Sequence, residues 1–298
     1  MAGDETLARR FEAERGRLRA IAHRMLGSPD EADDAVQEAW LRLFRTGGDG
    51  IDNLPAWLTT VVSRICLDML RAPSARREEP YGQQPPERNR AADGPEDTAL
   101  LGDSVGLALL VVLDRLGPAE RVAFVLHDLF GVPFDRIAPV VGRSRPAAKK
   151  LASRARHKVR GTPAVSGAEL DRHRRVVEAF LAAARGGDMD ALLDVLAPDV
   201  VRRADPAALP PGAAPELRGA RAVAEGTVLL RERSRYAAVA LVDGRAGIVV
   251  APQGRLLLAL RVTVEDERIG SYEVIAGPDR LSRVEVGVLG PPRLSRTR

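Results

Sequence analysis

The sequence predicts a multidomain protein in which two all-α domains precede a C-terminal α+β domain. Three observations support this class. Apolar residues repeat at helical spacing through residues 5–72 and 99–162, and the composition changes after Gly161-Thr162-Pro163. Beyond residue 235 the apolar runs are short and separated by turn dipeptides, as in a strand meander. The 298 residues are enough for two or three such domains.

Composition indicates a globular protein of a reducing compartment. Hydrophobic residues make up 45% of the chain and aromatic residues only 4%, so the cores must consist mainly of aliphatic side chains. A single cysteine, Cys66, excludes an internal disulfide, and its apolar neighbours Val62 and Ile65 predict a buried, inert thiol. No stretch approaches the ~18 apolar residues of a membrane span, and the N-terminus lacks a signal-peptide core. We expect a cytoplasmic protein without membrane contact.

The first unit, residues 5–72, contains three predicted helices. The first carries Leu18, Ile21 and Met25 and ends at Gly27-Ser28-Pro29. The second opens at Ser28 or Asp30 and continues to Arg45, with acidic residues early and basic residues late. Acidic residues near the start of a helix and basic residues near its end interact favourably with the helix macrodipole, so part of this charge pattern has a structural reason. A glycine-rich loop, 46–53, leads to a third helix that ends at Arg71.

Residues 73–98 form a predicted flexible linker. The segment has five prolines, two glycines, many charges and almost no apolar side chain. It cannot bury enough surface to fold alone, so we expect an extended chain here.

The second unit, residues 99–162, has four predicted helices. Gly117-Pro118 closes the first and Gly131 closes the second, while a short third helix after Val132 is stopped by Gly142. Pro139 falls inside that third helix, where a proline costs roughly 3 kcal/mol, so we expect a kinked or shortened helix.

The fourth helix, residues 142–160, carries eight Lys/Arg residues and no Asp or Glu. At 3.6 residues per turn it separates into an apolar seam and a basic face. The seam comprises Ala148, Leu151, Ala152, Ala155 and Val159, and the basic face comprises Arg145, Lys149, Ser153, Arg156 and Arg160. Ser144 is placed to cap the helix. A short helix, a glycine turn and a basic helix have the order of a helix-turn-helix that binds the DNA major groove. The alternative is a solvated amphipathic helix.

The third unit, residues 168–288, is the predicted α+β domain. A helix that carries Val177 and Phe180 ends at Gly186-Gly187, and a second short helix ends at Ala197-Pro198. After a proline-rich excursion and a helix over 219–230, strands are expected at 236–242, 247–251, 255–264, 269–276 and 281–288. Asp243-Gly244 and Gln253-Gly254 are the expected hairpin turns. Residues 289–298 are expected to be a disordered basic tail.

The two helical units together resemble a sigma-70-family RNA polymerase sigma factor of the extracytoplasmic-function (ECF) class. The segment DEADDAVQEAWLRLFR resembles the region that binds the polymerase clamp helices, and LPAWLTTVVSRICLDMLR resembles the region that melts and recognises the −10 promoter element. The basic helix-turn-helix then corresponds to sigma domain 4, which recognises the −35 element. The loop over 47–53 corresponds to the segment that holds a flipped non-template base.

The resemblance assigns site residues by position. It implies that core RNA polymerase is bound by Asp33, Asp34, Gln37, Glu38 and Leu41. It implies that promoter DNA is contacted from the first unit by Trp57, Arg64, Asp68 and Arg71. The helix-turn-helix adds Arg143, Ser144, Arg145, Lys149, Lys150, Ser153, Arg154 and Arg156. A solvated acidic face and a packing role for Trp57 are the structural alternatives.

The third unit resembles the SnoaL-like branch of the nuclear transport factor 2-like fold, a cone-shaped domain that extends one subgroup of these sigma factors. Gly277-Pro278-Asp279-Arg280-Leu281 is similar to that subgroup's Asn-Pro-Asp-Lys-Leu motif. Arg203-Ala204-Asp205-Pro206 stands where its Asp-Gly-Gly-Gly stretch is expected. The resemblance implies that this domain regulates the factor by contacting the sigma domains.

Two other functions are compatible with parts of the sequence. One is an ordinary helix-turn-helix regulator whose sheet domain binds a small ligand, which leaves the acidic helix and the Trp57 helix unexplained. The other is a SnoaL-like enzyme, which needs a base converging with a polar partner. The chain has no histidine after His173, and Glu273 is the one carboxylate expected to point inward. We therefore expect no catalytic residue, no metal and no cofactor.

Overall fold

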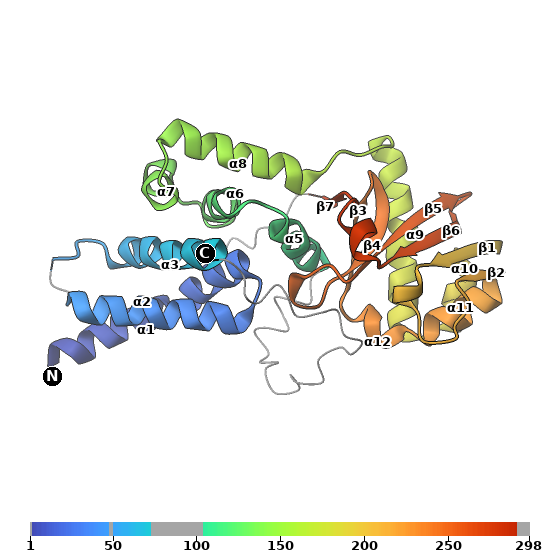
Figure 1. Ribbon diagram of the computed structural model, residues 1–298, viewed down its shortest axis with the longest axis horizontal. Coiled ribbons are helices and arrows are strands. Elements are labelled where there is room, and N and C mark those ends of the chain that lie inside the picture. Colours follow the sequence, from blue (N-terminus) through green and yellow to red (C-terminus); the bar gives the residue numbers. More distant parts are fainter. Residues whose placement is uncertain (1, 48–49, 73–103, 291–298) are drawn as a thin grey trace. The chain divides into compact units, whose positions relative to one another are not determined.

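The computed structural model describes residues 2–47, 50–72 and 104–290 (Figure 1). The chain divides into two compact units, and neither is continuous in sequence. One unit comprises Met1–Ala99 and Arg115–Arg156, and the other comprises Leu100–Asp114 and His157–Arg298. The predicted linker 73–98 and residues 291–298 of the predicted tail lie outside the described residues.

Three helices open the first unit, as the sequence predicts. They are α1 (Ala2–Leu26), α2 (Pro29–Thr46) and α3 (Leu54–Arg71). Leu18, Ile21, Met25, Leu43 and Leu58 are fully buried where these helices pack. Helix α1 begins well before the apolar repeat that predicts it.

Side-chain caps set the starting points of α2 and α3. The Ser28 hydroxyl accepts a hydrogen bond from the Glu31 N–H (3.4 Å), and the Asn53 side chain accepts one from the Ala56 N–H (3.0 Å). Each cap occupies N–H groups that have no partner within the helix. In both helices a proline stands in the first turn, where a missing N–H is tolerated.

The same unit holds the helix-turn-helix. Its elements are α6 (Pro118–Phe124), a π-helical turn η1 (Val125–Leu129), α7 (Phe134–Val141) and α8 (Arg145–Arg160). Helix α7 has eight residues and continues through Pro139 to Val141, so the shortening expected at the proline is absent. Gly142 ends α7 in the left-handed conformation (φ 65°), which a side chain would strain. Ser144 caps α8 as predicted.

Buried contacts join these helices to the three-helix bundle within the unit. Arg121 of α6 is only 3% exposed, and its Nη1 donates a hydrogen bond to the carbonyl oxygen of Met25 (2.9 Å). That oxygen lies in the last turn of α1, where carbonyl groups lack helical partners and a cation is favoured. Helix α3 also packs against α6 and α7.

Helix α5 (Ser104–Asp114) packs within the second unit, although the sequence groups it with the helix-turn-helix. It lies against β3 (Ala237–Val242), β7 (Val286–Gly287) and the turn η3 (Pro252–Gly254) (Figure 1). Its residues 106–113 are all buried. The ideal Cβ position of Gly254 is 3.0 Å from the Cβ of Leu110, so backbone and helix approach closely there.

The rest of the second unit is a mixed sheet covered by helices. The helices are α9 (Gly167–Gly186), α10 (Met189–Val195), α11 (Ala220–Val228), α12 (Arg231–Ser234) and α13 (Pro278–Leu281), with a 3-10 turn at Pro206–Ala208. The remaining strands are β1 (Leu196–Ala204), β2 (Glu216–Arg218), β4 (Arg245–Val250), β5 (Leu258–Glu265) and β6 (Arg268–Ile275). The strand order is β2-β1-β6-β5-β4-β3-β7, and only β1 and β6 pair in parallel.

The sheet confirms the α+β prediction and corrects three details. Asp243 and Gly244 (φ 47° and 79°) form the predicted hairpin turn, whereas the turn predicted at Gln253-Gly254 is part of a 3-10 turn in a longer connection between the antiparallel strands β4 and β5. The strand expected at 281–288 is mostly absent, because α13 occupies its start and only two residues pair as β7. Leu289, placed by the sequence in a disordered tail, is buried in the core.

The core of this unit lies between α9 and the curved sheet. Val177 and Phe180 of α9, Ile248 of β4, Val262 of β5 and Tyr272 of β6 are all buried there. Ser166 caps the start of α9, and Gly187 ends it in the left-handed conformation. Helix α9 packs as one element against β3, β4, β5 and β6.

Cys66 tests the packing of the first unit. The thiol is fully buried and free, and burial raises its pKa to about 12. Because the thiolate is the reactive species, we expect negligible alkylation by iodoacetamide in the native protein at about pH 8 and complete alkylation after unfolding. Mass spectrometry with and without denaturant measures this. Rapid alkylation of the native chain would contradict the packing around α3.

Candidate functional site

The outer face of α2 combines acidic and exposed apolar residues. Asp33, Asp34 and Gln37 are exposed, and Glu38 is half-buried. The Leu41 side chain is 44% exposed, although leucine is usually buried. The structure therefore places all five predicted polymerase-binding residues on accessible surface of one helix.

Ion pairs divide the acidic residues of this face. Asp33 Oδ1 accepts from Arg19 Nε of α1 at 2.8 Å, and Glu38 Oε1 accepts from Arg42 Nε at 2.8 Å. The hydrogen bond from Arg42 lowers the pKa of Glu38. Asp34 forms no ion pair with any residue that the structure describes. Its charge is thus the one most available to a partner.

Phe44 extends this face and was missed by sequence reasoning. Its side chain is 56% exposed, one turn after Leu41. Its ring lies 6.0 Å from that of Trp40, which in turn lies 5.0 Å from Phe11. A large exposed aromatic residue beside a leucine is typical of a protein-binding surface. The spacing 34, 37, 41, 44 along one helical face was the available signal.

The predicted −10 residues lie on one face of α3. Arg64, Asp68 and Arg71 are exposed and Trp57 is half-buried, at intervals that repeat along the helix. Arg64 Nη2 approaches the carbonyl oxygen of Pro139 in α7 at 3.5 Å. The preceding loop is described only in part, because residues 48–49 lie outside the described residues, whereas Asn53 at its end caps the helix.

Helix α8 presents the two faces that its sequence predicts. Ala148, Ala152, Ala155 and Val159 are buried and Leu151 is half-buried, which confirms the apolar seam. The exposed residues of the predicted DNA-binding set are Arg143, Ser144, Arg145, Lys149, Lys150, Ser153 and Arg154.

Acidic residues of the same unit bind part of this basic set. Arg156 Nε donates to Asp128 Oδ1 at 2.6 Å, and Arg156 is half-buried. Arg154 pairs with Glu120 at 3.4 Å, and Arg145 pairs with Asp135 at 3.2 Å. Lys149 and Lys150 form no ion pair with a described residue. Arg156 is therefore held by an internal ion pair, whereas the two lysines are available to phosphates.

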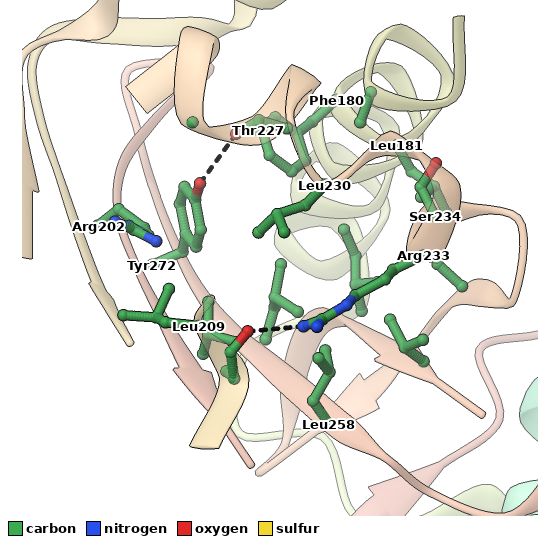
Figure 2. Close-up of a pocket in the computed structure, with 18 residues that line it drawn as sticks. Phe180, Leu181, Arg202, Leu209, Thr227, Leu230, Arg233, Ser234, Leu258 and Tyr272 are labelled. Atoms are coloured by element: carbon green, nitrogen blue, oxygen red, sulfur yellow. Dashed lines mark hydrogen bonds between the residues drawn. The ribbon is translucent and has the colours of Figure 1, made fainter. Parts of the chain in front are cut away.

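The C-terminal unit contains a partly open cavity of about 90 Å³ between α9 and the sheet. Its wall is mainly apolar, with Phe180 from α9, Leu230, and Leu258 from β5 (Figure 2). Two guanidinium groups, those of Arg202 and Arg233, also line it. None of the described residues in its wall is Asp, Glu or His.

Glu273, which the sequence places inward, is not in that wall. Its Oε2 accepts from Arg261 Nη1 at 2.7 Å, and its Oε1 accepts from Arg280 Nη2 at 2.6 Å. Both acceptor oxygens are thus occupied by arginines outside the cavity. Across the described ranges, no three His, Cys, Asp or Glu side chains are grouped as a metal ion would require, and no helix is long and apolar enough to span a membrane.

The two motif-like segments of the third unit meet at Asp205. Its Oδ2 accepts hydrogen bonds from the N–H groups of Ala276 (3.0 Å) and Gly277 (3.2 Å), and its Oδ1 accepts from Arg280. Burial disfavours the charged carboxylate, but these donated hydrogen bonds and the guanidinium of Arg280 outweigh it and lower the pKa of Asp205. Asp205 therefore fastens the start of the 277–281 segment to the end of β1.

Known proteins match the chain in the same two helical regions and along its length. The family model of sigma-70 region 2 matches residues 10–77, and that of sigma-70 region 4 matches residues 106–159. Among curated relatives, the ECF RNA polymerase sigma factor SigJ of Mycobacterium tuberculosis is 39% identical, with 91% of this chain and 92% of that protein covered. The chain therefore belongs to the ECF sigma factors of RNA polymerase.

Two further matches are similar over most of the chain. A Mycobacterium tuberculosis protein described as "Probable ECF RNA polymerase sigma factor SigI" is 35% identical, with 96% of this chain and 99% of that protein covered. The crystal structure of Mycobacterium tuberculosis SigJ, at 35% identity, covers 92% of this chain and 98% of that chain with a TM-score of 0.46. Proteins of this family bind core RNA polymerase and promoter DNA, and the chain is a transcription initiation factor.

Alanine substitution of Arg156 is expected to change the stability of the protein, and alanine substitution of Lys149 and Lys150 is expected to change its binding to DNA. Arg156→Ala leaves the Asp128 carboxylate half-buried without its partner, so we expect a loss of about 2 kcal/mol in stability and a lower melting temperature. Lys149→Ala/Lys150→Ala removes no internal contact, so the melting temperature stays unchanged. The double variant should instead reduce the salt dependence of promoter binding by up to about 2 in log–log slope.

Calorimetry and holoenzyme–promoter binding at several salt concentrations measure the two effects. Equal melting temperatures for Arg156→Ala and the wild type would contradict the structural role of Arg156. An unchanged salt slope for the lysine variant would exclude phosphate contacts by these two residues.

Asp205 is expected to make the C-terminal unit sensitive to acid. Because its pKa is lowered in the folded state, its stabilising contribution is present above the unfolded pKa of about 4 and is lost as the pH falls through the folded value. Asp205→Asn should therefore lower the melting temperature at neutral pH, and the difference from the wild type should shrink in acid. Asp279→Asn, at an exposed position of the same segment, is the control and should leave the melting temperature unchanged. A difference that persists in acid would contradict the assignment.

Proposed function

We propose that α2 carries the polymerase-docking surface of this sigma factor, through Asp33, Asp34, Gln37, Glu38 and Leu41, extended by Phe44. One observation supports this proposal. The exposed apolar side chains of Leu41 and Phe44 lie on the same helix as Asp34, whose carboxylate has no ion-pair partner among the described residues. Apolar contact supplies affinity, and the negative charge favours a basic partner surface. The chain then acts in the cytoplasm with core polymerase.

We propose that promoter DNA is bound by α3 and α8. On α3 the residues are Trp57, Arg64, Asp68 and Arg71, and the loop over 47–53 holds the flipped base. On α8 and its turn, Arg143, Ser144, Arg145, Lys149, Lys150, Ser153 and Arg154 face the −35 element, while Arg156 supports the helix through Asp128. Lys149 and Lys150 are exposed and form no ion pair with a described residue, which supports phosphate binding by these two side chains.

In this proposal the C-terminal domain regulates the activity of the sigma factor by restraining helix α5 through packing contacts. The match to the region 4 family model begins at residue 106, yet helix α5 (Ser104–Asp114) packs with the C-terminal unit. A helix that is apolar on every side is stable only when buried on every side. Strands β3 and β7 and the η3 turn contribute to that burial. The domain therefore restrains the first helix of region 4.

Catalysis is not part of this proposal. The cavity wall lacks a carboxylate or an imidazole among its described residues, so no general base faces the cavity. Tyr272, which does line it, has its pKa raised by burial and is paired with Thr227 (3.1 Å).

The docking surface can be tested by co-purification with core RNA polymerase. Asp34→Arg and Phe44→Ala should each weaken binding at least about tenfold, because charge and exposed apolar area both contribute at such surfaces. Asp34 is preferred to Asp33, since reversal at Asp33 would also break the ion pair with Arg19.

Asp171→Arg is the matched control, because Asp171 is an exposed carboxylate on α9. It should bind core polymerase as the wild type does. Wild-type affinity in both α2 variants would place the docking surface elsewhere.

The restraint on α5 can be tested at Gly254. A methyl group there meets the Leu110 Cβ at 3.0 Å, so Gly254→Ala should push η3 and α5 apart. We expect faster hydrogen exchange in residues 104–114 and more promoter-specific transcription with core polymerase. Deleting residues 168–298 is less informative, since it would also remove the sheet on which α5 packs.

Gly212→Ala controls for backbone strain. Both glycines have positive φ (81° and 76°), but a Cβ at Gly212 meets no atom within 4 Å. The control should change neither exchange nor transcription. Faster exchange in α5 without a change in transcription would exclude the restraint as the regulatory mechanism.

A further inference from the structure

Arg202 is a buried cation in the wall of the C-terminal cavity. It is 6% exposed and points inward from β1, whereas its neighbour Arg203 is exposed and pairs with Glu216 at 2.9 Å. Its guanidinium lies beside the ring of Tyr272 (Figure 2).

Arg202 is only partly satisfied by the protein. Its Nη2 donates to the carbonyl oxygen of Ala214 (2.9 Å), but its Nε is buried and has no hydrogen-bond partner among the described residues. No carboxylate of those residues pairs with it. A buried charge and a buried donor are both costly when uncompensated.

The other polar groups of the wall supply neither a hydrogen-bond acceptor for Arg202 Nε nor a negative charge. The Thr227 hydroxyl donates to the Val223 carbonyl (2.8 Å), which lets it accept from the Tyr272 hydroxyl (3.1 Å). Arg233 Nη1 donates to the Ala208 carbonyl at 2.6 Å and adds a second positive charge (Figure 2). The Ser234 hydroxyl donates to the Arg231 carbonyl (2.6 Å). The cavity thus offers positive charge and an unused N–H donor, and the rest of its wall is mainly apolar.

We propose that this cavity binds a short-chain carboxylate whose oxygen accepts from Arg202 Nε and whose hydrocarbon part contacts Leu258 and Phe180. A carboxylate satisfies the donor and compensates the charge, whereas a neutral carbonyl satisfies only the donor. The cavity is small, about 90 Å³, and partly open, so a short carboxylate is the class of ligand that suits it. Butyrate, with about six non-hydrogen atoms, is a suitable probe. This binding is independent of polymerase and promoter.

The wild-type chain provides the first test. Butyrate and its neutral isostere butyramide are titrated separately into full-length protein labelled at isoleucine, leucine and valine methyl groups. The Ile248 and Leu258 methyl signals, which line the cavity, should shift with butyrate and saturate. Butyrate should bind at least about tenfold more tightly than butyramide, because the hydrogen bond to Arg202 is charge-assisted.

Variants then assign the interaction. Arg202→Met should abolish the preference for butyrate, and Arg203→Gln, on the opposite face of the same strand, should retain it. If Arg202→Met fails to fold, the comparison of the two isosteres in the wild type still decides the charge requirement.

Three results would overturn the proposal. No saturable shift at Ile248 would show that the cavity takes no such ligand. Equal affinity for butyrate and butyramide would show apolar binding without anion recognition. Equal shifts with inorganic phosphate would show that Arg202 holds any anion and that the hydrocarbon wall does not select a carboxylate.

Discussion

The burial of α5 is the constraint on which the arrangement of the chain depends. Residues 106–113 carry no charge and are buried on every side, so the helix is stable only with apolar cover around it. In the second unit β3, β7 and η3 contribute cover. Helix α5, where the match to region 4 begins, consequently packs with the C-terminal domain.

Ion pairs decide which charges in the helical unit are left for partners. The ion pair between Arg156 and Asp128 stabilises the packing of α8, and Arg19 forms an ion pair with Asp33 on α2. Asp34 on α2 and Lys149 and Lys150 on α8 form no ion pair with a described residue. The charge pattern of the sequence therefore predicts more binding residues than are available on each surface, because some of the charged residues form ion pairs within the protein.

The C-terminal domain has two kinds of charge with different consequences. On the outside, Asp205, Arg280, Glu273 and Arg261 form successive ion pairs that hold the 277–281 segment to the sheet. Inside, Arg202 has no such neighbour. The exposed network is satisfied without a ligand, whereas the interior cation is not. Regulation by a small molecule and restraint of α5 would then reside in one domain, since strand β4 leads from the cavity wall to the η3 turn beneath α5.

Local sequence determined much of this protein. Apolar periodicity, the caps Ser28, Asn53 and Ser144, and the glycines after α7 and α9 set the helices, because each acts within one or two turns. The family assignment followed from two such segments. Tertiary structure alone decided that α5 joins the sheet, that Arg156 is structural, and that Glu273 is turned away from the cavity and Arg202 into it. Those outcomes depend on partners distant in the chain, which no local pattern encodes.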